Sequence, residues 1–283
     1  MLRRIHAAAS VDVKNRELHD RERDLADAAA RFFRSQRDEL IPRLRELEGT
    51  FPTVESLREA PSESDVDRIW RAVSDATEGP LENAIDQVAP EAMRAGGTAV
   101  ARDVGLAASF RVGHPEAVRY LENLGARRVS GVNRETRRQL ATLLSQAVAQ
   151  GWSYQRSERA IRDRFDGFAA RQPQLHIGSR AELIAVTETA DAYEHGQWMV
   201  REDLREQGVA TVRRWLSAGD ERVCEICDGN EADGWIDGGV FSSGHSRPPG
   251  HPACRCAAQT RVASGSRVGA DQALPGMTSL TPA

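Results

Sequence analysis

Residues 13–47 read VKNRELHDRERDLADAAARFFRSQRDELIPRLREL, a run of dense charge interrupted at regular intervals by apolar side chains. The apolar residues recur every three or four positions, which places them on one stripe of a helix. Pro42 has no backbone N–H to donate, so we expect a bend near it. The stripe consists of Leu18, Leu25, Ala28, Ala29, Phe32, Phe33, Leu40, Leu44 and Leu47. This stretch predicts a mainly α-helical fold with long N-terminal helices.

A second helical segment is expected to begin near Ser62. Asp65 follows Ser62 by three positions and an apolar run lies beyond it, a pattern typical of a helix start. Glycine and proline then punctuate the chain and predict interruptions. The expected interruptions are a break at Gly79-Pro80, a boundary at 113–115 and a loop at 125–131. Residues 81–110 between them are expected to be helical, with a weak point at Gly96-Gly97.

Three more helices are expected between residues 132 and 207, because apolar residues again recur at helical spacing. The residues that mark their ends are Gly151, Ser153, Gly167, Ser179 and Gly208. Val212 and Trp215 then suggest a short strand, and the chain becomes irregular. The expected organisation is an N-terminal helical region (1–112), a linker (113–131), a domain (132–262) ending in an irregular knuckle with short strands (215–262), and a tail (263–283). The tail lacks periodicity and is predicted to be disordered.

All four cysteines fall in two short clusters near the C-terminus. The first is CEIC (224–227), whose two-residue spacer lets both sulfurs reach one tetrahedral Zn²⁺ at about 2.3 Å. The second is HPACRC (251–256), which offers three more donors, so one of the five is surplus. The candidate ligands are Cys224, Cys227, His251, Cys254 and Cys256. We expect one Zn²⁺ per chain, with His251 and Cys256 as the preferred second pair and Cys254 with Cys256 as the rival.

Two other interpretations of the cysteines stay open. Two disulfides would need an oxidising compartment, and no export signal supports one. A redox Cys-x-x-Cys would normally open a helix in a βαβ unit, whereas Asp228-Gly229 follows this pair. A metal site is favoured, because the intervening segment 228–250 is too rich in Gly and Pro to fold without help.

The metal is expected to be structural. A catalytic zinc keeps one position open for water and has a general acid or base beside it. Here protein donors can fill all four positions, and the nearby Glu225, Asp228 and His245 are more simply loop residues. The sequence contains no Gly-rich phosphate loop, nucleophile elbow or His-Glu-x-x-His motif. We therefore expect no catalytic activity and no small-molecule substrate.

Charge is unevenly distributed along the chain. Residues 111–171 contain twelve Arg against six Asp and Glu. Such a region could lie against phosphates or an acidic protein, although a solvated helix face is the simpler explanation. No stretch is long and apolar enough to predict a membrane span, so no membrane partner is expected.

Three motifs follow one another in the second half of the chain. The first is GWS (151–153), a turn ahead of a helix, and the second is RAELIAVTE, from Arg180 to Glu188. The third starts at Trp215, continues through DERVCEIC from Asp220 and through Phe241, and ends in PPGHPACRC (248–256), which includes Arg255. Together they resemble the phage head morphogenesis family, to which the F protein of phage Mu belongs. The resemblance covers roughly residues 130–262, and the N-terminal half is similar only in style.

The resemblance implies a minor head protein of a tailed phage or prophage, with residues 132–262 as its head morphogenesis domain. Its implied partners are the portal protein or the major capsid protein, and in some cases packaged double-stranded DNA. Its implied location is the virion, in the head interior or at the portal vertex, with assembly in the host cytoplasm. Many relatives lack the first cysteine pair, so the zinc prediction rests on the donors of this chain. The residues implied to serve structure or partner binding are Arg180, Glu188, Trp215, Asp220 and Arg255.

Two other functions stay open. A nucleic-acid-binding zinc module would use the basic 111–171 region, and its affinity would fall steeply with salt. A zinc-scaffolded nuclease of the His-Asn-His type would need a His base beside a metal-binding His or Asn, and the sequence shows no such pair.

One pairing is predicted between the knuckle and the helix that precedes it. Arg255 stands between two candidate ligands, where a partly desolvated guanidinium needs a carboxylate. We expect Glu188 to supply it, because Glu188 lies one helical turn from Ile184 and so on the inward face of its helix.

Overall fold

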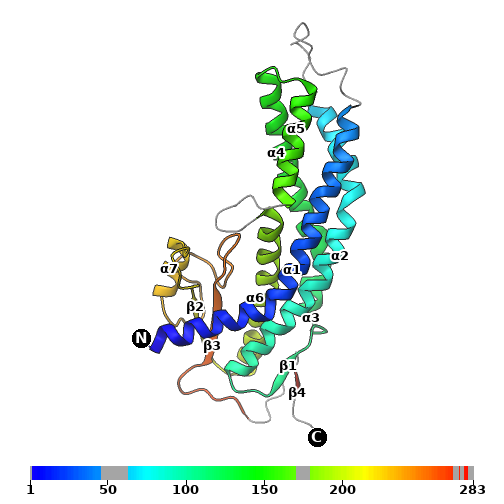
Figure 1. Ribbon diagram of the computed structural model, residues 1–283. Coiled ribbons are helices and arrows are strands. Elements are labelled where there is room, and N and C mark those ends of the chain that lie inside the picture. The colour runs from blue at the N-terminus through cyan, green and yellow to red at the C-terminus, as the bar shows by residue number, and fades with distance from the viewer. Residues whose placement is uncertain (1, 46–62, 170–178, 270–273, 275–276, 280–283) are drawn as a thin grey trace. The chain divides into compact units, whose positions relative to one another are not determined.

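The computed structural model describes residues 2–45, 63–169, 179–269, 274 and 277–279. Helices make up most of this described chain and the strands are short (Figure 1), which confirms the predicted mainly α-helical fold. Within these ranges no helix combines the length and the apolar character that a membrane span requires.

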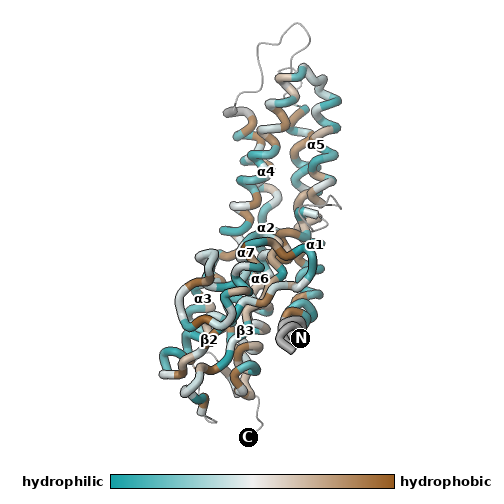
Figure 2. The backbone as a smooth tube through the Cα atoms, turned by 90° about the vertical axis from the view of Figure 1, so that its left-hand side faces the viewer, coloured by the Kyte–Doolittle hydropathy of each residue, from teal (hydrophilic) through white to brown (hydrophobic). Residues whose placement is uncertain are grey.

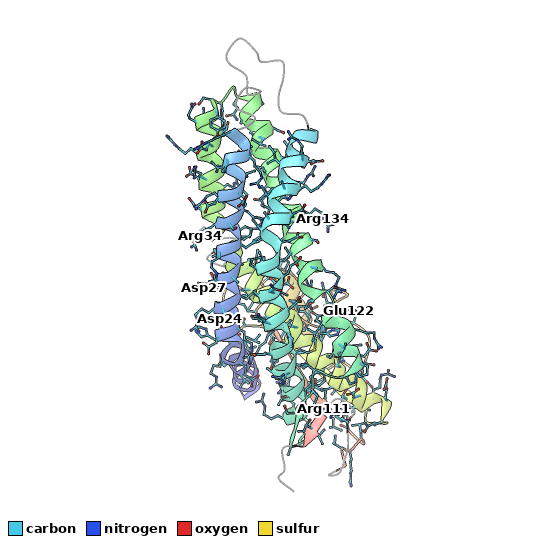
Figure 3. All side chains as sticks on the ribbon, turned by 90° about the vertical axis from the view of Figure 1, so that its right-hand side faces the viewer. Asp24, Asp27, Arg34, Arg111, Glu122 and Arg134 are labelled. Carbon is cyan, nitrogen blue, oxygen red and sulfur yellow. The ribbon has the colours of Figure 1, made fainter. Side chains whose placement is uncertain are left out.

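The first helix, α1 (Leu2–Arg45), carries the predicted apolar stripe. Leu18, Phe33 and Leu40 on this stripe are fully buried. The exposed face is charged and includes Asp24, Asp27 and Arg34 (Figure 3). The helix continues past Pro42 to its end, and Leu47 lies outside the described residues.

The second helix, α2 (Glu63–Asp103), starts where the sequence predicts, but it is not interrupted. The break predicted at Gly79-Pro80 is therefore wrong, and the helix also passes through the weak point predicted at Gly96-Gly97. The Cβ of a residue before proline normally clashes with the proline ring when the backbone is helical. Gly79 has no Cβ, so the helix can continue into Pro80. Gly96 is a packing position: a Cβ there would lie 1.9 Å from the backbone oxygen of Tyr193 in α6 (Arg180–Glu206).

Helical structure also replaces the loop predicted at 125–131. α3 (Pro115–Leu121) lies in the predicted linker, and α4 (Leu124–Ala149) contains both Gly125 and Gly131. A Cβ on Gly125 would lie 2.5 Å from the backbone oxygen of Glu82 in α2. This glycine therefore permits close helix packing and does not mark a loop. The predicted stop at Gly151 is confirmed by its positive φ of 61°.

The next two helices agree with their predictions. α5 (Tyr154–Ala169) and α4 alternate between apolar and polar segments (Figure 2), as amphipathic helices do. α6 begins after Ser179, whose Oγ accepts the backbone N–H of Glu182 at 3.1 Å and so caps the helix. Gly208, with a φ of 77°, closes it.

Four short strands form two antiparallel pairs. β2 (Thr211–Leu216), which contains the predicted strand, pairs with β3 (Ala257–Val262). β1 (Ala108–Phe110) pairs with β4 (Met277–Ser279). The tail predicted to be disordered therefore contains a strand, and its Leu274 is buried in the same core cluster as Phe110. These tail residues are ordered by partners far away in the sequence, which no local periodicity reveals.

The chain forms two compact units, each assembled from separated segments. The first comprises Met1–Asp24, Asp86–Glu122 and Leu183–Ala283, and the second comprises Leu25–Ile85 and Asn123–Glu182. In the second unit a buried amide network crosses the core: Gln36 donates to Asn133 at 2.7 Å, and Asn133 donates to Ser74 at 2.7 Å. The first unit contains both cysteine clusters, and we describe it in more detail below.

Candidate metal centre

The first cysteine pair lies where the chain leaves β2 and enters a short helix, α7 (Glu225–Ala232). Cys224 occupies the N-cap, and its carbonyl oxygen accepts the N–H of Asp228 at 2.9 Å. The prediction that no helix opens at this pair is wrong, because Asp228 and Gly229 belong to α7. Both strand pairs of the described chain are antiparallel, so the pair is not part of a βαβ redox unit.

The second cluster lies on a tight turn that α6 stabilises. Ala253 has a φ of 65°, a left-handed conformation that costs a non-glycine residue on the order of 1–3 kcal/mol. Its backbone N–H donates to Oγ1 of Thr187 in α6 at 3.1 Å. Gly250 lies beneath the indole of Trp215, where a Cβ would come within 3.2 Å of the ring. The turn therefore depends on one residue of α6 and one of β2.

The structure brings all five predicted donors together. Nε2 of His251 lies 3.2 Å from Sγ of Cys224 and 3.3 Å from Sγ of Cys227. Sγ of Cys227 lies 3.7 Å from Sγ of Cys254. Ligand atoms around one tetrahedral zinc are roughly 3.4–3.8 Å apart, given bond lengths of about 2.1–2.3 Å. The Sγ–Sγ separation lies within this range, and the two Nε2–Sγ separations lie slightly below it. The Sγ–Sγ separation is too long for a disulfide, whose sulfurs are about 2.05 Å apart, and no disulfide joins the four cysteines.

The donor atoms form two trios, in each of which every atom lies within 4.8 Å of the others. Cys224, Cys227 and His251 make the first trio, and Cys227, Cys254 and Cys256 make the second. Cys227 belongs to both. Each second pair considered from the sequence lies next to the first pair, and the choice of four ligands stays a prediction.

The tautomer of His251 suits metal binding. Its Nδ1 lies 2.7 Å from the carbonyl oxygen of Pro252, a geometry in which Nδ1–H donates to the carbonyl. Nε2, which faces the two sulfurs, then carries the free lone pair. Histidines that bind metals usually donate their other ring N–H in this way. The donor set and its surroundings are thus those of a site that could hold a metal ion.

The buried thiols also shift one another's pKa. Hydrogen bonds from the thiols of Cys227 and Cys256 lower the pKa of Cys254 well below its usual range. The pKa of Cys227 is raised, chiefly by its hydrogen bond with Cys254 and secondly by its hydrogen bond with Cys256. The cluster thus favours one thiolate in its interior, and the thiolate is the form of cysteine that binds metals.

An apolar shell and one arginine surround the donors. Trp215, fully buried, packs edge-on against Phe241 with ring centroids 5.3 Å apart, and both belong to one core cluster with three of the cysteines. The buried Arg213 of β2 donates to the backbone oxygens of Ser246 and Gly239. The loop between the two cysteine clusters is therefore held by Arg213 as well as by any metal. An arginine in a strand gives no sequence signal for this role.

The predicted pairing of Arg255 with Glu188 is wrong. The guanidinium of Arg255 donates two parallel hydrogen bonds to the carboxylate of Asp220, at 2.7 and 2.8 Å. Asp220 lies between β2 and Cys224. The ion pair therefore connects the segment that leads into the first cysteine pair with the second cluster. Glu188 is half-buried on α6, and it is its neighbour Thr187 that contacts the knuckle turn. The helix was identified correctly, but the contacting side chain was one position off.

We expect Asp220 to stay ionised down to about pH 2 in the folded chain, because the hydrogen bond from Arg255 lowers its pKa to about 2. A lowered pKa means that the ion pair stabilises the fold above the ordinary aspartate pKa and that this contribution is lost as the pH falls towards 2. Arg255→Gln should return the Asp220 pKa towards about 3.9, measured by NMR titration of the carboxyl carbon. Arg222→Gln is the control and should change the value much less. An unchanged Asp220 pKa in Arg255→Gln would contradict the pairing.

Arg180, predicted to serve structure or partner binding, lies in the second unit. Its guanidinium lies over the rings of Phe33 and Phe168, 5.0 and 4.7 Å from their centroids. It donates to Oγ1 of Thr136 and to the carbonyl oxygen of Val132. Burial lowers its pKa to about 10. The observed contacts of Arg180 are therefore those of a residue that ties α6 to α4 and α1.

One comparison with known proteins matches the segment that contains the three motifs. Residues 138–259 match the family described as Phage Mu protein F like protein. This segment runs from α4 into β3, so it contains α6, β2 and all five donors, and it covers less than half of the chain. No curated protein and no solved structure matches the chain. Over residues 138–259 the chain is thus similar to the phage Mu protein F like family, as the motifs indicated, and this similarity suggests a phage head morphogenesis protein.

Proposed function

We propose that this chain is a minor head protein of a tailed phage or prophage and that it acts in head assembly. The observation that carries the proposal is the family match over residues 138–259, which includes α5, α6 and all five donors of the knuckle. A protein with this role would bind the portal protein or the major capsid protein and would be found in the virion. Handling of packaged double-stranded DNA is a further part of the proposed role.

We also propose that the knuckle holds one structural Zn²⁺. Five donors surround the site, so protein atoms can complete a four-coordinate shell without a position for water. The shell around them is apolar, with Trp215 and Phe241 at its centre. His245, the nearest further histidine in sequence, is within hydrogen-bonding distance of the hydroxyl of Ser243, 2.8 Å from its Nδ1. These features support a structural metal and no catalytic role.

A nucleic-acid-binding module receives less support from the structure. Several arginines of the basic 111–171 region already have carboxylate partners. The pairs are Arg137 with Asp67, Arg138 with Glu135 and Arg162 with Glu158. Paired arginines would have to give up these carboxylates before they could neutralise phosphates. The proposed contacts with head proteins therefore rank above a role centred on DNA.

Incorporation into heads tests the proposal. In a phage or induced prophage that encodes the chain, purified particles should contain it in a few copies each, measured by quantitative mass spectrometry against the major capsid protein. An in-frame deletion should leave fewer infectious or DNA-filled heads, and the intact gene supplied in trans should restore them. Tailless heads should retain the protein if it binds the portal or the capsid. Particles that lack the protein, or a deletion without any effect on heads, would contradict the proposal.

A further inference from the structure

The sequence contains a single lysine, Lys14, and the structure buries it. Its Nζ lies 3.0 Å from Oε1 of Glu194 in α6, and the two side chains are 3 % and 0 % exposed. A lysine ammonium is expensive to remove from water unless its hydrogen bonds are satisfied. Every other Lys or Arg position in the chain is arginine, so a compact ammonium at this one position indicates a specific contact.

That contact is with the metal centre. Nζ of Lys14 also donates to the backbone oxygen of Cys256 at 2.6 Å. The backbone N–H of Ala258 donates to the carboxylate of Glu194, 3.3 Å from each oxygen. The ion pair therefore binds both backbone groups on either side of Ala257, where the last cysteine leads into β3.

The position of these two backbone groups explains why they need outside partners. Among the strands of the described residues β3 pairs with β2, so the backbone groups on its other edge need partners from outside the sheet. Lys14 and Glu194 satisfy part of that edge from α1 and α6. Apolar contacts accompany them, since Val11 of α1 is buried against Leu216 and Ala257. Figure 1 shows the N-terminal end of α1 beside β2 and β3.

We propose that Lys14 is a positioning residue for the metal centre, so that docking of α1 onto β3 and metal binding strengthen each other. The inference rests on the proposed zinc site. With its backbone oxygen held by Lys14, Cys256 keeps its thiol in the trio with Cys227 and Cys254. Residues that orient metal ligands through a second layer of hydrogen bonds commonly change metal affinity 10- to 100-fold. Because such coupling is reciprocal, the metal in turn stabilises the docked α1.

The decisive variant is the double change Lys14→Met with Glu194→Met. Replacing both members of a buried ion pair by apolar side chains often preserves stability, whereas removing one strands a buried charge. The double variant therefore removes the two hydrogen bonds to β3 while the fold remains intact. We expect it to release zinc to a chromophoric chelator about 10-fold faster than the wild type. The single variant Lys14→Arg keeps the positive charge but should also release zinc faster than the wild type, because a planar guanidinium does not fit the space of an ammonium.

Two controls separate positioning from general loss of stability. Arg16→Met removes an exposed charge from the same helix and should release zinc at the wild-type rate. Val73→Ala weakens the core of the second unit and should lower the thermal midpoint without faster zinc release. A double variant that releases zinc within twofold of the wild-type rate, or no faster than Val73→Ala, would overturn the inference.

Hydrogen exchange provides the reciprocal measurement. Chelating zinc from the wild type should speed amide exchange in residues 11–18 of α1, and the double variant should exchange fast there before chelation. If amide exchange in residues 11–18 changes neither on chelation nor in the double variant, the coupling is overturned, while the metal centre itself is not contradicted. A wild-type chain that holds no zinc would overturn the metal centre itself, and the inference with it.

Discussion

Gly96→Ala should lower the free energy of unfolding of the first unit by about 3 kcal/mol or more, although alanine is the better helix former. A Cβ at position 96 would lie 1.9 Å from the backbone oxygen of Tyr193 and 2.7 Å from its carbonyl carbon. Both atoms belong to the backbone of α6, so no side-chain rotation can relieve the clash. The two helices would have to separate, and the buried side chains between them would lose contact.

The same helix contact includes a glycine on the other side. A Cβ on Gly196 of α6 would lie 2.1 Å from the backbone oxygen of Met93 in α2. Gly196→Ala should therefore destabilise the unit by a similar amount. Because both substitutions force the same two helices apart, their effects in the double variant should add up to less than the sum of the single effects.

Gly131→Ala is the matched control. Gly131 is exposed in α4, and nothing lies within 4 Å of a Cβ built there. This substitution should raise stability by about 0.5–1 kcal/mol, as glycine-to-alanine changes in open helix positions do. Urea denaturation followed by circular dichroism measures all the variants. A Gly96→Ala chain as stable as Gly131→Ala would show that α2 and α6 do not approach as closely as described.

The predictions that the structure confirms rest on sequence patterns whose residues lie within one helix or beside its ends. The stripe of α1 follows from apolar spacing within one helix. The two ends of α6 follow from local features as well, the capping hydrogen bond of Ser179 and the positive φ of Gly208. The five donor residues were also identified from local spacing, and the structure brings them together in two trios, while the ligand set stays a prediction. The short spacer of CEIC places Cys224 and Cys227 in one trio, whereas their contacts with His251 join residues 27 and 24 positions apart.

The failures share a dependence on distant partners. Gly96 and Gly125 resemble breaks in a sequence, and only the neighbouring helix shows that they are packing positions. The pairing of β4 with β1 joins segments more than 160 residues apart. Lys14 lies 242 residues from Cys256, and its one sequence signal, being the only lysine, does not point to a partner.

Cys227→Ser should abolish zinc binding, whereas single changes at the other donors should be tolerated better. Five donors compete for four positions, so removal of the surplus donor leaves a complete set. Cys227 differs because it belongs to both trios and is 2 % exposed at the centre of the cluster. Serine keeps the shape of the side chain, but its hydroxyl is not ionised at neutral pH and is a poor ligand for zinc.

Metal analysis of chains purified with excess zinc and then gel-filtered gives the readout. We expect about one zinc per chain in the wild type, because a complete structural site binds zinc with a free energy on the order of 10 kcal/mol and so retains it during gel filtration. Cys227→Ser should lose most of this affinity and retain less than about a tenth as much zinc. His251→Ala, Cys254→Ser and Cys256→Ser form the matched series, and the variant that retains most zinc identifies the surplus donor. Amide exchange should rise across 215–262 in Cys227→Ser and stay unchanged in α4 and α5 of the second unit. A Cys227→Ser chain that still holds one zinc would show that the two trios do not share a central ligand.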